Sequence, residues 1–403
     1  MTMRRYMITV MAALAAAMLW AQTPAGGVTA QKAGQQGTFP VQIYSGLQDA
    51  FHVQGVVYDR QRGCIYMSFT TSLIKVDLSG RLLASVTGLT GHLGSIGLNP
   101  DDGRLYGSIE YKHDEIGTGI TGKLGVKNDV QTGFYIAIFD LDRLTRVGMT
   151  PDEVMTTVYM PEVAKDYQAE VTNQGRRLEH RYAASGIDGL TFAPKWGKRG
   201  GRHYLYVAYG VYGDTTRTDN DHQVLLCYDV RNWNRYARRI DQGHIHQSGP
   251  SKPMAKYFVY TGSTDYGIQN LEYDAATGYM YAAVYPGFKS QWPRYTLYVL
   301  NTLEKPHRGV LRGVEPQTQA AMLSLVHTGK PSAGGEVWGW ERTRGATGIT
   351  ALGDGLFYLS QSGADRATKR HYCRLHLYRW SDGQGFVQLR QAPKVGCRPS
   401  ARR

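Results

Sequence analysis

Four polar residues occupy equivalent places in a recurring phrase of this sequence and could do chemistry together. They stand just before hydrophobic runs, in His52-Val-Gln54-Gly, Gly186-Ile-Asp188-Gly, Gly267-Ile-Gln269-Asn and Ala346-Thr347-Gly. Amide, carboxylate and hydroxyl oxygens are ligands that Ca²⁺ accepts in proteins, together with water. If the four positions converge on one axis, we expect these side chains to hold a calcium ion. The alternative is a polar channel in which the same groups satisfy one another's hydrogen bonds.

Three residues are candidates for proton transfer: Asp188, His113 and His52. Histidine titrates near neutral pH, and a carboxylate beside a cation stays ionised, so both can act as general acid or base. Long polar segments at residues 111–133, 210–223, 285–294 and 361–372 carry groups that could bind an anionic small molecule or a glycan. These groups are Lys112, Tyr212, Arg217, Trp292, Arg294 and Arg366. For any one of them, the alternative is solvated surface.

Other metal and hydrolase motifs are incomplete or missing from the sequence. His244 and His246 form a His-x-His pair, but no third ligand stands near them. The acidic run at 214–221 lacks the spacing of an EF-hand loop. No G-x-S-x-G, H-E-x-x-H or P-loop sequence occurs. The sequence therefore gives no support to a serine hydrolase or zinc hydrolase of the usual kinds.

A phrase built on a tyrosine, with a small residue two places further on, returns five times and indicates which elements position these groups. Its tyrosines are Tyr66, Tyr106, Tyr206, Tyr281 and Tyr358. Self-similarity at spacings of tens of residues is typical of repeat architectures. Each repeat contains four strand-like segments bounded by Gly, Asp or Asn turns. This pattern predicts an all-β fold, a five-bladed β-propeller with four strands in each blade.

Several details of the propeller follow from the same pattern. A strand-like segment at 41–45 precedes the first repeat, and we expect it to close the ring by joining the last blade. The segment 322–326 is expected to be the fourth strand of the fourth blade. The recurrent tyrosines and small residues are expected to pack between blades. Six blades are the alternative if two have been merged, but residues 161–185 are polar or helical rather than strand-like.

The predicted propeller places the candidate residues on one face. The innermost strands of a propeller line its central channel, and their starts lie on the same face as the connections between strands two and three. The long polar segments are these connections, whereas the turns between strands one and two are short. We therefore expect function on the face with the long connections, where Asp188 begins an inner strand.

The N-terminus predicts export. Arg4 and Arg5 precede an apolar run from Met7 to Trp20, which is typical of a signal peptide covering residues 1–21. The alternative is an uncleaved anchor. Residues 22–40 are predicted to be a disordered leader and 41–403 a single propeller domain. No cysteine follows the apolar run, so we expect a secreted or periplasmic protein without a lipid anchor, and no membrane span in the mature chain.

The charge of the chain limits its possible partners, and its cysteines allow one disulfide. The net charge of +13 favours anionic partners, but the basic residues are dispersed and no nucleic-acid-binding motif occurs. We expect no nucleic-acid partner, and a monomer. Cys373 and Cys397 could pair and tie down the C-terminal tail. The alternative is that these two, with Cys64 and Cys227, are buried thiols.

Two inner-strand phrases carry a family resemblance. Gly186-Ile-Asp-Gly-Leu-Thr-Phe and Gly267-Ile-Gln-Asn-Leu-Glu-Tyr resemble strand starts in secreted propellers of the gluconolactonase type and in calcium-activated apyrases. The resemblance covers these short segments and implies a calcium ion on the propeller axis that takes part in hydrolysis. The chain departs from those families at Gln54, Gln269 and Thr347, where more acidic ligands would be expected.

Two functions are compatible with these features. One is an exported hydrolase or lyase that binds an anionic small molecule or glycan at the channel. The other is a non-catalytic propeller that binds a glycan or a partner protein on the same face. Catalysis requires acidic and imidazole groups that converge within hydrogen-bonding reach at the channel.

Overall fold

The computed structural model describes residues 38–48, 51–127, 131–242 and 244–393. The predicted signal peptide and residues 22–37 of the predicted leader lie outside these ranges. Residues 39 and 40 contact the propeller: the Phe39 ring packs edge-on against Tyr58 at 5.4 Å, and the Tyr358 hydroxyl donates to the Pro40 carbonyl at 2.7 Å. Among the described residues, no helix is both long and apolar enough to cross a membrane.

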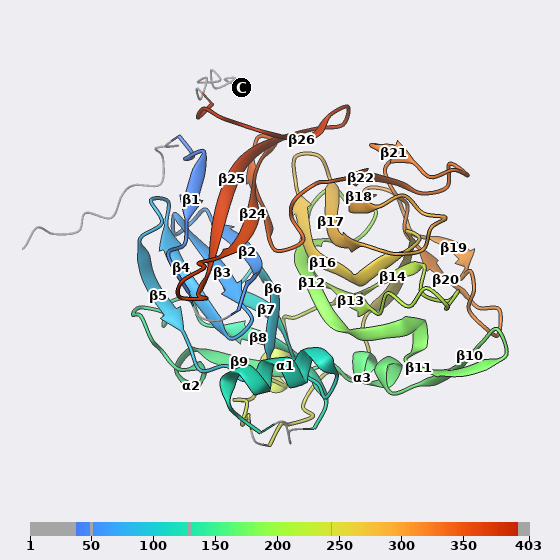
Figure 1. The fold of residues 1–403 in the computed structure, drawn as a ribbon, viewed down its shortest axis with the longest axis horizontal. Coiled ribbons are helices and arrows are strands. Elements are labelled where there is room, and N and C mark those ends of the chain that lie inside the picture. The colour runs from blue at the N-terminus through green and yellow to red at the C-terminus, as the bar shows by residue number, and fades with distance from the viewer. Residues whose placement is uncertain (1–37, 49–50, 128–130, 243, 394–403) are drawn as a thin grey trace, which may run out of the picture. The chain divides into compact units, whose positions relative to one another are not determined.

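Five antiparallel sheets form the predicted five-bladed propeller, and each runs outward from an inner strand (Figure 1). Blade 1 comprises β2 (Val53–Asp59), β3 (Cys64–Phe69), β4 (Ser72–Asp77) and β5 (Leu82–Val86). Blade 2 comprises β6 (His92–Leu98), β7 (Leu105–Tyr111), β8 (Gly133–Phe139) and β9 (Met155–Tyr159). Blade 3 comprises β12 (Ala184–Pro194), β13 (His203–Val211), β14 (His222–Tyr228) and β15 (Ala255–Tyr260), and at its edge carries β20 (Gln319–Met322) and β19 (His307–Val310).

Blades 4 and 5 complete the ring. Blade 4 comprises β16 (Thr264–Asp274), β17 (Tyr279–Pro286), β18 (Tyr295–Asn301) and β22 (Trp338–Glu341), followed by β21 (Lys330–Pro331). Blade 5 comprises β23 (Ile349–Gly353), β24 (Leu356–Ala364) and β25 (His371–Ser381), with β26 (Gly385–Gln388) and β1 (Gln42–Tyr44) on the outer side of β25. The segment 161–185 forms α3 (Pro161–Tyr167) and a hairpin of β10 (Glu170–Asn173) and β11 (Arg176–Glu179) before β12 begins. The six-blade alternative is therefore excluded.

The N-terminal strand closes the ring as predicted. β1 pairs antiparallel with β25, with Ile43 opposite Leu375, and Ile43 is buried. β26 pairs with a later part of β25, with Phe386 opposite Trp380. The outer edge of the last blade is thus covered by two segments from opposite ends of the chain, which removes an exposed strand edge.

The fourth strand of blade 4 differs from the prediction. It is β22, which pairs with β18, whereas Met322 lies in β20, which runs parallel to β15 at the edge of blade 3. Slightly further on, Val326 donates to the Val299 carbonyl of blade 4. The segment 322–326 therefore crosses between two blades. A strand-forming composition does not specify which sheet edge the segment joins.

The recurrent tyrosines pack between blades, as predicted. All five are fully buried. Tyr106 of blade 2 meets Phe192 of blade 3 at 4.9 Å between ring centroids, and Tyr281 of blade 4 meets Phe357 of blade 5 at 5.1 Å. Five hydrophobic clusters together bury these contacts and the corresponding ones around the ring. Edge-to-face aromatic pairs of this kind stabilise beyond their buried area, so the repeat encodes the blade interfaces.

Cys64, Cys227 and Cys373 are buried thiols. Burial raises the pKa of the Cys227 thiol to about 12, which keeps it protonated and unreactive at neutral pH. Cys397 lies outside the described residues, so its pairing with Cys373 stays a prediction.

Candidate functional site

A β-bulge interrupts the inner strand of blades 1 to 4 at the same level of the channel. The pairing register shifts between Val53 and Gly55, between Leu93 and Ile96, between Ile187 and Leu190, and between Ile268 and Asn270. Gln54, Asp188 and Gln269 lie in these bulges, and Thr347 lies just before β23 in blade 5. Bulges re-aim side chains and occur next to active sites. Three of the four positions aligned from the sequence are therefore structurally equivalent, in bulges of the inner strands.

In two of the five repeats the small residue of the phrase is a serine that supports the bulge of the next blade. The Ser68 hydroxyl of blade 1 donates to the Gly94 carbonyl of blade 2 at 2.6 Å. The Ser108 hydroxyl of blade 2 donates to the backbone carbonyl of Asp188 in blade 3 at 2.8 Å. A bulge takes its carbonyl out of the strand ladder, and each hydroxyl provides the missing partner. Asp188 is thus held by the blade before its own.

Asn270 joins four blades at the channel. Its Nδ2 donates to the carbonyls of Gln54 in blade 1 (2.9 Å) and Ala346 before blade 5 (2.8 Å). Its Oδ1 accepts from the Ser95 hydroxyl of blade 2 at 3.2 Å. The side chain is buried, and its donors and acceptor are all used. Asn270 therefore fixes the inner strands against one another.

A buried ion cluster begins at the end of β7. The Lys112 ammonium contacts Glu110 Oε1 at 2.6 Å and Asp114 Oδ2 at 3.2 Å, and donates to the Ser185 carbonyl at 2.8 Å. Glu110 Oε2 also accepts from the Ile187 amide at 3.1 Å. These donors, chiefly the Lys112 charge, hold the pKa of Glu110 below its usual range in spite of burial. Glu110 is therefore an ionised carboxylate beside the start of β12.

Asp188 lies close to this cluster, and its pKa is shifted in the opposite direction from that of Glu110. It is half-buried, and its Oδ2 accepts from Gln269 Nε2 at 3.2 Å. Burial, followed by the negative charge of Glu110, raises its pKa to about 6. A Cβ at Gly210 would stand 3.0 Å from Asp188 Oδ2, so this glycine leaves room for the carboxylate. Two neighbouring carboxylates thus have pKa values pushed apart by their surroundings.

Tyrosines surround these carboxylates. The Tyr212 hydroxyl donates to Asp114 Oδ2 at 3.0 Å. Tyr285 lies near Asp188 and Asp265, whose charges add to burial in raising its pKa to about 12. Tyr266 is exposed, and its carbonyl accepts from Gln269 Nε2 at 2.8 Å. We call the following residues the mouth: Glu110, Lys112, Asp114, Asp188, Tyr212, Asp265, Tyr266, Gln269 and Tyr285.

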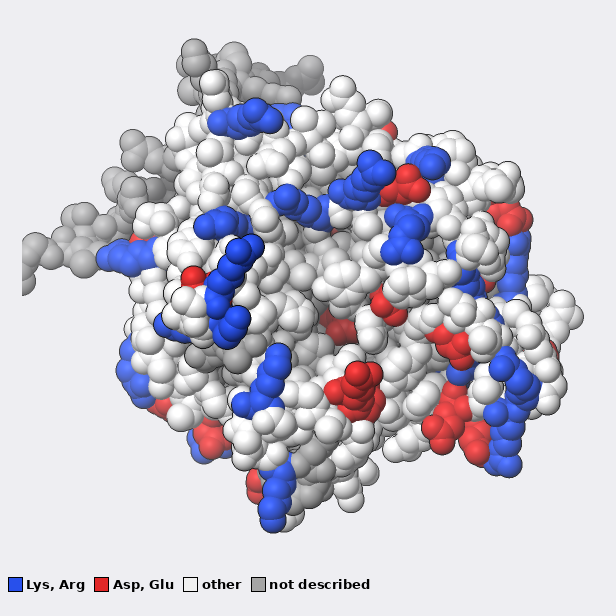
Figure 2. All heavy atoms as spheres, in the orientation of Figure 1, with Lys and Arg blue, Asp and Glu red and all other residues white. Residues whose placement is uncertain are grey.

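The face that carries α1 (Glu115–Leu124) is hollowed in its middle, and Asp and Glu side chains lie beside the depression (Figure 2). Helix α1 begins at the mouth, where its N-cap residue Asp114 accepts from the Gly117 amide at 2.9 Å. The cap therefore ties the helix to the Lys112 cluster. Tyr266 and Gly267 both have left-handed backbone conformations, with φ of 58° and 70°. Such strain in a non-glycine residue clusters at functional sites.

The other two predicted proton-transfer residues do not meet Asp188. His113 is exposed, and its backbone carbonyl accepts from the Thr118 hydroxyl at 3.4 Å. His52 lies 3.2 Å from Gln54 Nε2, and burial, with nearby positive charges, lowers its pKa to about 4. His92, which the sequence analysis did not single out, contacts Glu110 instead at 3.4 Å. The histidine that contacts a carboxylate of the mouth is thus His92, at Glu110, and not one of the two predicted.

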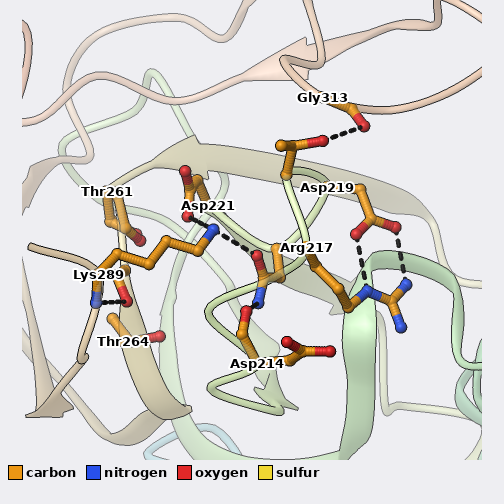
Figure 3. A network of polar contacts seen from close by, with 12 residues as sticks. Asp214, Arg217, Asp219, Asp221, Thr261, Thr264, Lys289 and Gly313 are labelled. Carbon is orange, nitrogen blue, oxygen red and sulfur yellow. Dashed lines mark hydrogen bonds and ion pairs between the residues drawn. The ribbon is translucent and has the colours of Figure 1, made fainter. Parts of the chain in front are cut away.

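Of the six predicted ligand-binding residues, only Lys112 and Tyr212 lie in the mouth. Arg217 is buried and donates to both oxygens of Asp219 at 2.8 Å and to the carbonyls of Glu179 and His180 (Figure 3). Trp292 packs against Gly262, where an added Cβ would be 2.4 Å from its ring. Arg294 and Arg366 are exposed. Lys112 and Arg217 are thus already neutralised within the protein.

A second buried lysine joins blades 3 and 4 beside Arg217 (Figure 3). Lys289 Nζ donates to Asn220 Oδ1 at 2.7 Å and to Asp221 Oδ1 at 2.5 Å. This lysine comes from the β17–β18 connection and its partners from the β13–β14 connection. The ion pair therefore fastens two long connections together, which is a structural role.

The predicted calcium ligands are not arranged as a cage. Asp188 and Gln269 are in contact, whereas Thr347 bonds Ser360 of its own blade at 2.6 Å and Gln54 bonds Thr70 at 3.0 Å. The described part of the chain contains no group of three or more His, Cys, Asp or Glu side chains that could hold a metal ion. The calcium site stays a prediction, and chelation tests it.

Sequence reasoning missed Glu110, Asp265 and Tyr266, although one signal was present. Ser108, Glu110 and Lys112 alternate along a strand and so lie on one face of it. A carboxylate within an otherwise apolar strand is rarely buried without a partner, and Lys112 is that partner. Asp265 and Tyr266 carry no comparable signal, because they lie at the start of β16, before the phrase Gly267-Ile-Gln269-Asn that the repeats share.

Three solved structures are distantly similar to this chain. The chain is similar to one in the crystal structure of a nidogen/laminin complex, at 10% identity over 79% of this chain and 78% of that chain, with a TM-score of 0.31. It is also similar to the hydrazine synthase of Kuenenia stuttgartiensis (9% identity, 83% and 68% covered, TM-score 0.30). A third similar structure is a functionally unknown protein from Desulfotomaculum acetoxidans (9% identity, 84% and 69% covered, TM-score 0.30). No protein-family model and no curated protein matches the sequence.

Proposed function

We propose that the mouth is the active site of a hydrolase or lyase that cleaves a glycan. The observation that carries this proposal is the pair Asp188 and Glu110, whose pKa values are shifted in opposite directions. Pairs of carboxylates with separated pKa values are how acid–base enzymes keep one group protonated and the other ionised near neutral pH. A glycan is favoured over an anionic small molecule because Lys112 and Arg217 are already paired with protein carboxylates.

In this proposal Asp188 is the general acid. With a pKa of about 6 it is partly protonated near neutral pH and can give its proton to the oxygen of the leaving sugar as the glycosidic C–O bond breaks. In a hydrolase a water molecule then adds to the anomeric carbon and releases its proton to solvent, so the bond to the leaving sugar is replaced by a bond to hydroxyl. Glu110 remains ionised through Lys112 and the Ile187 amide, and its negative charge favours the protonated form of Asp188. The Ser108 hydroxyl and Gln269 amide hold Asp188 in place from neighbouring blades. Lys112 acts through Glu110 and is a positioning residue.

The test is turnover of a panel of oligosaccharides by the full chain and by two variants. Asp188→Asn keeps the Gln269 contact and is expected to lower kcat by about 10²–10⁴-fold, the usual contribution of a general acid. The matched control is Glu272→Gln, which changes a carboxyl on the same strand as Gln269 that instead accepts from the Ala351 amide at 2.6 Å. We expect the control to retain activity.

The pH profile adds a second readout. Activity that needs protonated Asp188 falls as the pH rises above about 6. Turnover that is equal in wild type and Asp188→Asn refutes the proposed acid. If an oligosaccharide binds at the mouth but no member of the panel is cleaved, the protein is instead a non-catalytic glycan-binding propeller, the other function considered from the sequence.

A further inference from the structure

The mouth has more hydrogen-bond acceptors than donors. Gln269 Nε2 lies between two acceptors, the Tyr266 carbonyl and Asp188 Oδ2, which fixes the orientation of its amide. Its Oε1 has no partner among the described residues, although the side chain is nine-tenths buried. Asp188 Oδ1 and the half-buried carboxylate of Asp265 accept no hydrogen bond from the described part of the chain, and since neither is among its buried unpartnered side-chain atoms, both are open to solvent. A ligand that donates hydrogen bonds would satisfy all three groups.

The mouth is also acidic within a basic protein. Glu110, Asp114, Asp188 and Asp265 face one ammonium group, that of Lys112, whereas the whole chain has a net charge of +13. Glu115 adds another carboxylate at the first turn of α1. In Figure 2 many Lys and Arg side chains lie away from the central depression, and acidic ones lie next to it. A local field of this sign attracts a cationic group and repels an anionic one.

Tyr266 offers an exposed aromatic ring beside the carboxylates. It directly follows Asp265, and the charges of Asp265, Glu115 and Asp114 add to burial in raising its pKa. Its backbone is held at φ 58°, a conformation that glycine adopts without strain. Aromatic faces bind both sugar rings and cations, the latter through the ring quadrupole. The fold therefore retains a strained tyrosine where a glycine would be easier to accommodate.

We propose that the glycan carries a free amine, and that its protonated amino sugar is held by Asp265 and Gln269 and stacked on Tyr266. This inference rests on the proposed function and names its substrate class. An ammonium group supplies a positive charge and three N–H donors, which match an unpaired carboxylate and an unpaired amide oxygen. A neutral sugar supplies donors but no charge, and an acidic sugar brings the wrong charge.

The experiment compares ligands that differ only in the substituent at C2 of the sugar, which is an amine, an acetamide or a hydroxyl. The full chain is titrated calorimetrically at pH 6 and low salt with β-1,4-linked hexamers of glucosamine, N-acetylglucosamine and glucose. If a hexamer is cleaved during the titration, Asp188→Asn is used, because it leaves in place Asp265 and Gln269, the two residues proposed to hold the ammonium group. We expect the glucosamine hexamer to bind about tenfold more tightly than either neutral hexamer, with the preference falling as salt screens the charges. A basic protein has no non-specific attraction for this cation.

Three variants locate the interaction. Asp265→Asn is expected to weaken glucosamine hexamer binding by about tenfold and to leave the neutral hexamers unchanged. Tyr266→Gly is expected to weaken all three ligands while the melting temperature stays the same or rises, because strain is released. The control Asp152→Asn changes an exposed carboxylate in α2 (Pro151–Val154), between strands three and four and so on the opposite face, and should change nothing.

The outcomes separate this inference from the function on which it rests. Equal affinity for the three hexamers, or no binding of the glucosamine hexamer, overturns the inference. A preference that survives Asp265→Asn also overturns it. Preferential binding of the glucosamine hexamer without turnover of any glycan supports the inference and contradicts the proposed function. Turnover of neutral glycans without a preference for the amine supports the proposed function and overturns the inference.

Discussion

Asp188 and Glu110 are expected to affect stability with opposite signs, although they lie close together. The folded-state pKa of Asp188 is about 6, above its ordinary value of 3.8. The folded protein therefore binds more protons than the unfolded chain between these pH values, and stability falls as the pH rises through that window. Asp188→Asn removes this cost. We expect the variant to be more stable than wild type at pH 7.5, and to lose that advantage at pH 4.

The magnitude follows from the difference in pKa. The interval from 3.8 to about 6 corresponds to about 3 kcal/mol at 1.36 kcal/mol per pKa unit. Asp188 is partly exposed, and an asparagine packs less favourably than a protonated carboxyl in the same place, so about 1–2 kcal/mol is the expected gain. Such a cost is typical of catalytic groups, the role proposed for Asp188.

Glu110 provides the contrast. Its pKa is held below the ordinary value, so its contribution to stability is present above pH 4.5 and is lost as the pH falls. Glu110→Gln leaves the buried Lys112 ammonium with Asp114 as its remaining carboxylate in the mouth. Removing one partner of a buried ion pair usually costs about 3–5 kcal/mol. We expect a loss near the lower end, because Asp114 and the Ser185 carbonyl remain.

The assay is urea unfolding of wild type and both variants at pH 4, 5.5 and 7.5, followed by circular dichroism. The slope of free energy against urea concentration should be the same for all three, so that the midpoints report stability. An Asp188→Asn variant that is less stable than wild type at pH 7.5 would refute the reasoning. A stability difference between wild type and Asp188→Asn that does not change with pH would refute it as well.

Three further predictions concern the channel. Asn270→Ala removes the bonds to Gln54, Ala346 and Ser95 and should lower the unfolding free energy by about 3–5 kcal/mol, since each unpaired buried group costs about 1–3 kcal/mol; a loss below about 1 kcal/mol in urea would contradict the bridging role. Glu272→Gln should flatten the loss of stability between pH 5 and 8.5, because burial raises the pKa of Glu272 to about 8 and ionising it destabilises the fold; a melting-temperature profile that keeps the wild-type slope would count against this. Chelation should leave the melting temperature unchanged, whereas stabilisation by added calcium that Asp188→Asn abolishes would favour the calcium site instead.

The blades could be predicted because their sequence signal is local and repeated. Tyr66 and its four counterparts mark the second strand of each blade, and all are buried between blades as expected. The closing strand around Ile43 was also identified, because a strand-like segment before the first repeat could cover the edge of the last blade. The segment at Met322 was assigned to the wrong blade. Its composition favours a strand at either sheet edge, and tertiary contacts choose between them.

The site was predicted in part, because the repeat identified some of its residues and not others. Asp188 and Gln269 were found because both occupy the same place in the repeat, and both lie in bulges that contact each other. His113 follows the same strand as Glu110, but it is exposed while Glu110 is buried. Every residue of β7 is buried and His113 lies beyond its end at Tyr111, a boundary that the sequence analysis had not fixed. Arg217 looked available for a ligand, whereas the fold pairs it with Asp219.

The sequence by itself determined that four strands recur five times and that polar groups stand where each inner strand begins. These properties depend on residues near one another in the chain. Only the tertiary structure decided that Glu110 of one blade raises the pKa of Asp188 in the next, and that Lys112 is used within the protein. The physical reason is that pKa values depend on burial and on charges nearby in space. Those neighbours come from adjacent blades, and the repeat alone does not specify which of their side chains come into contact.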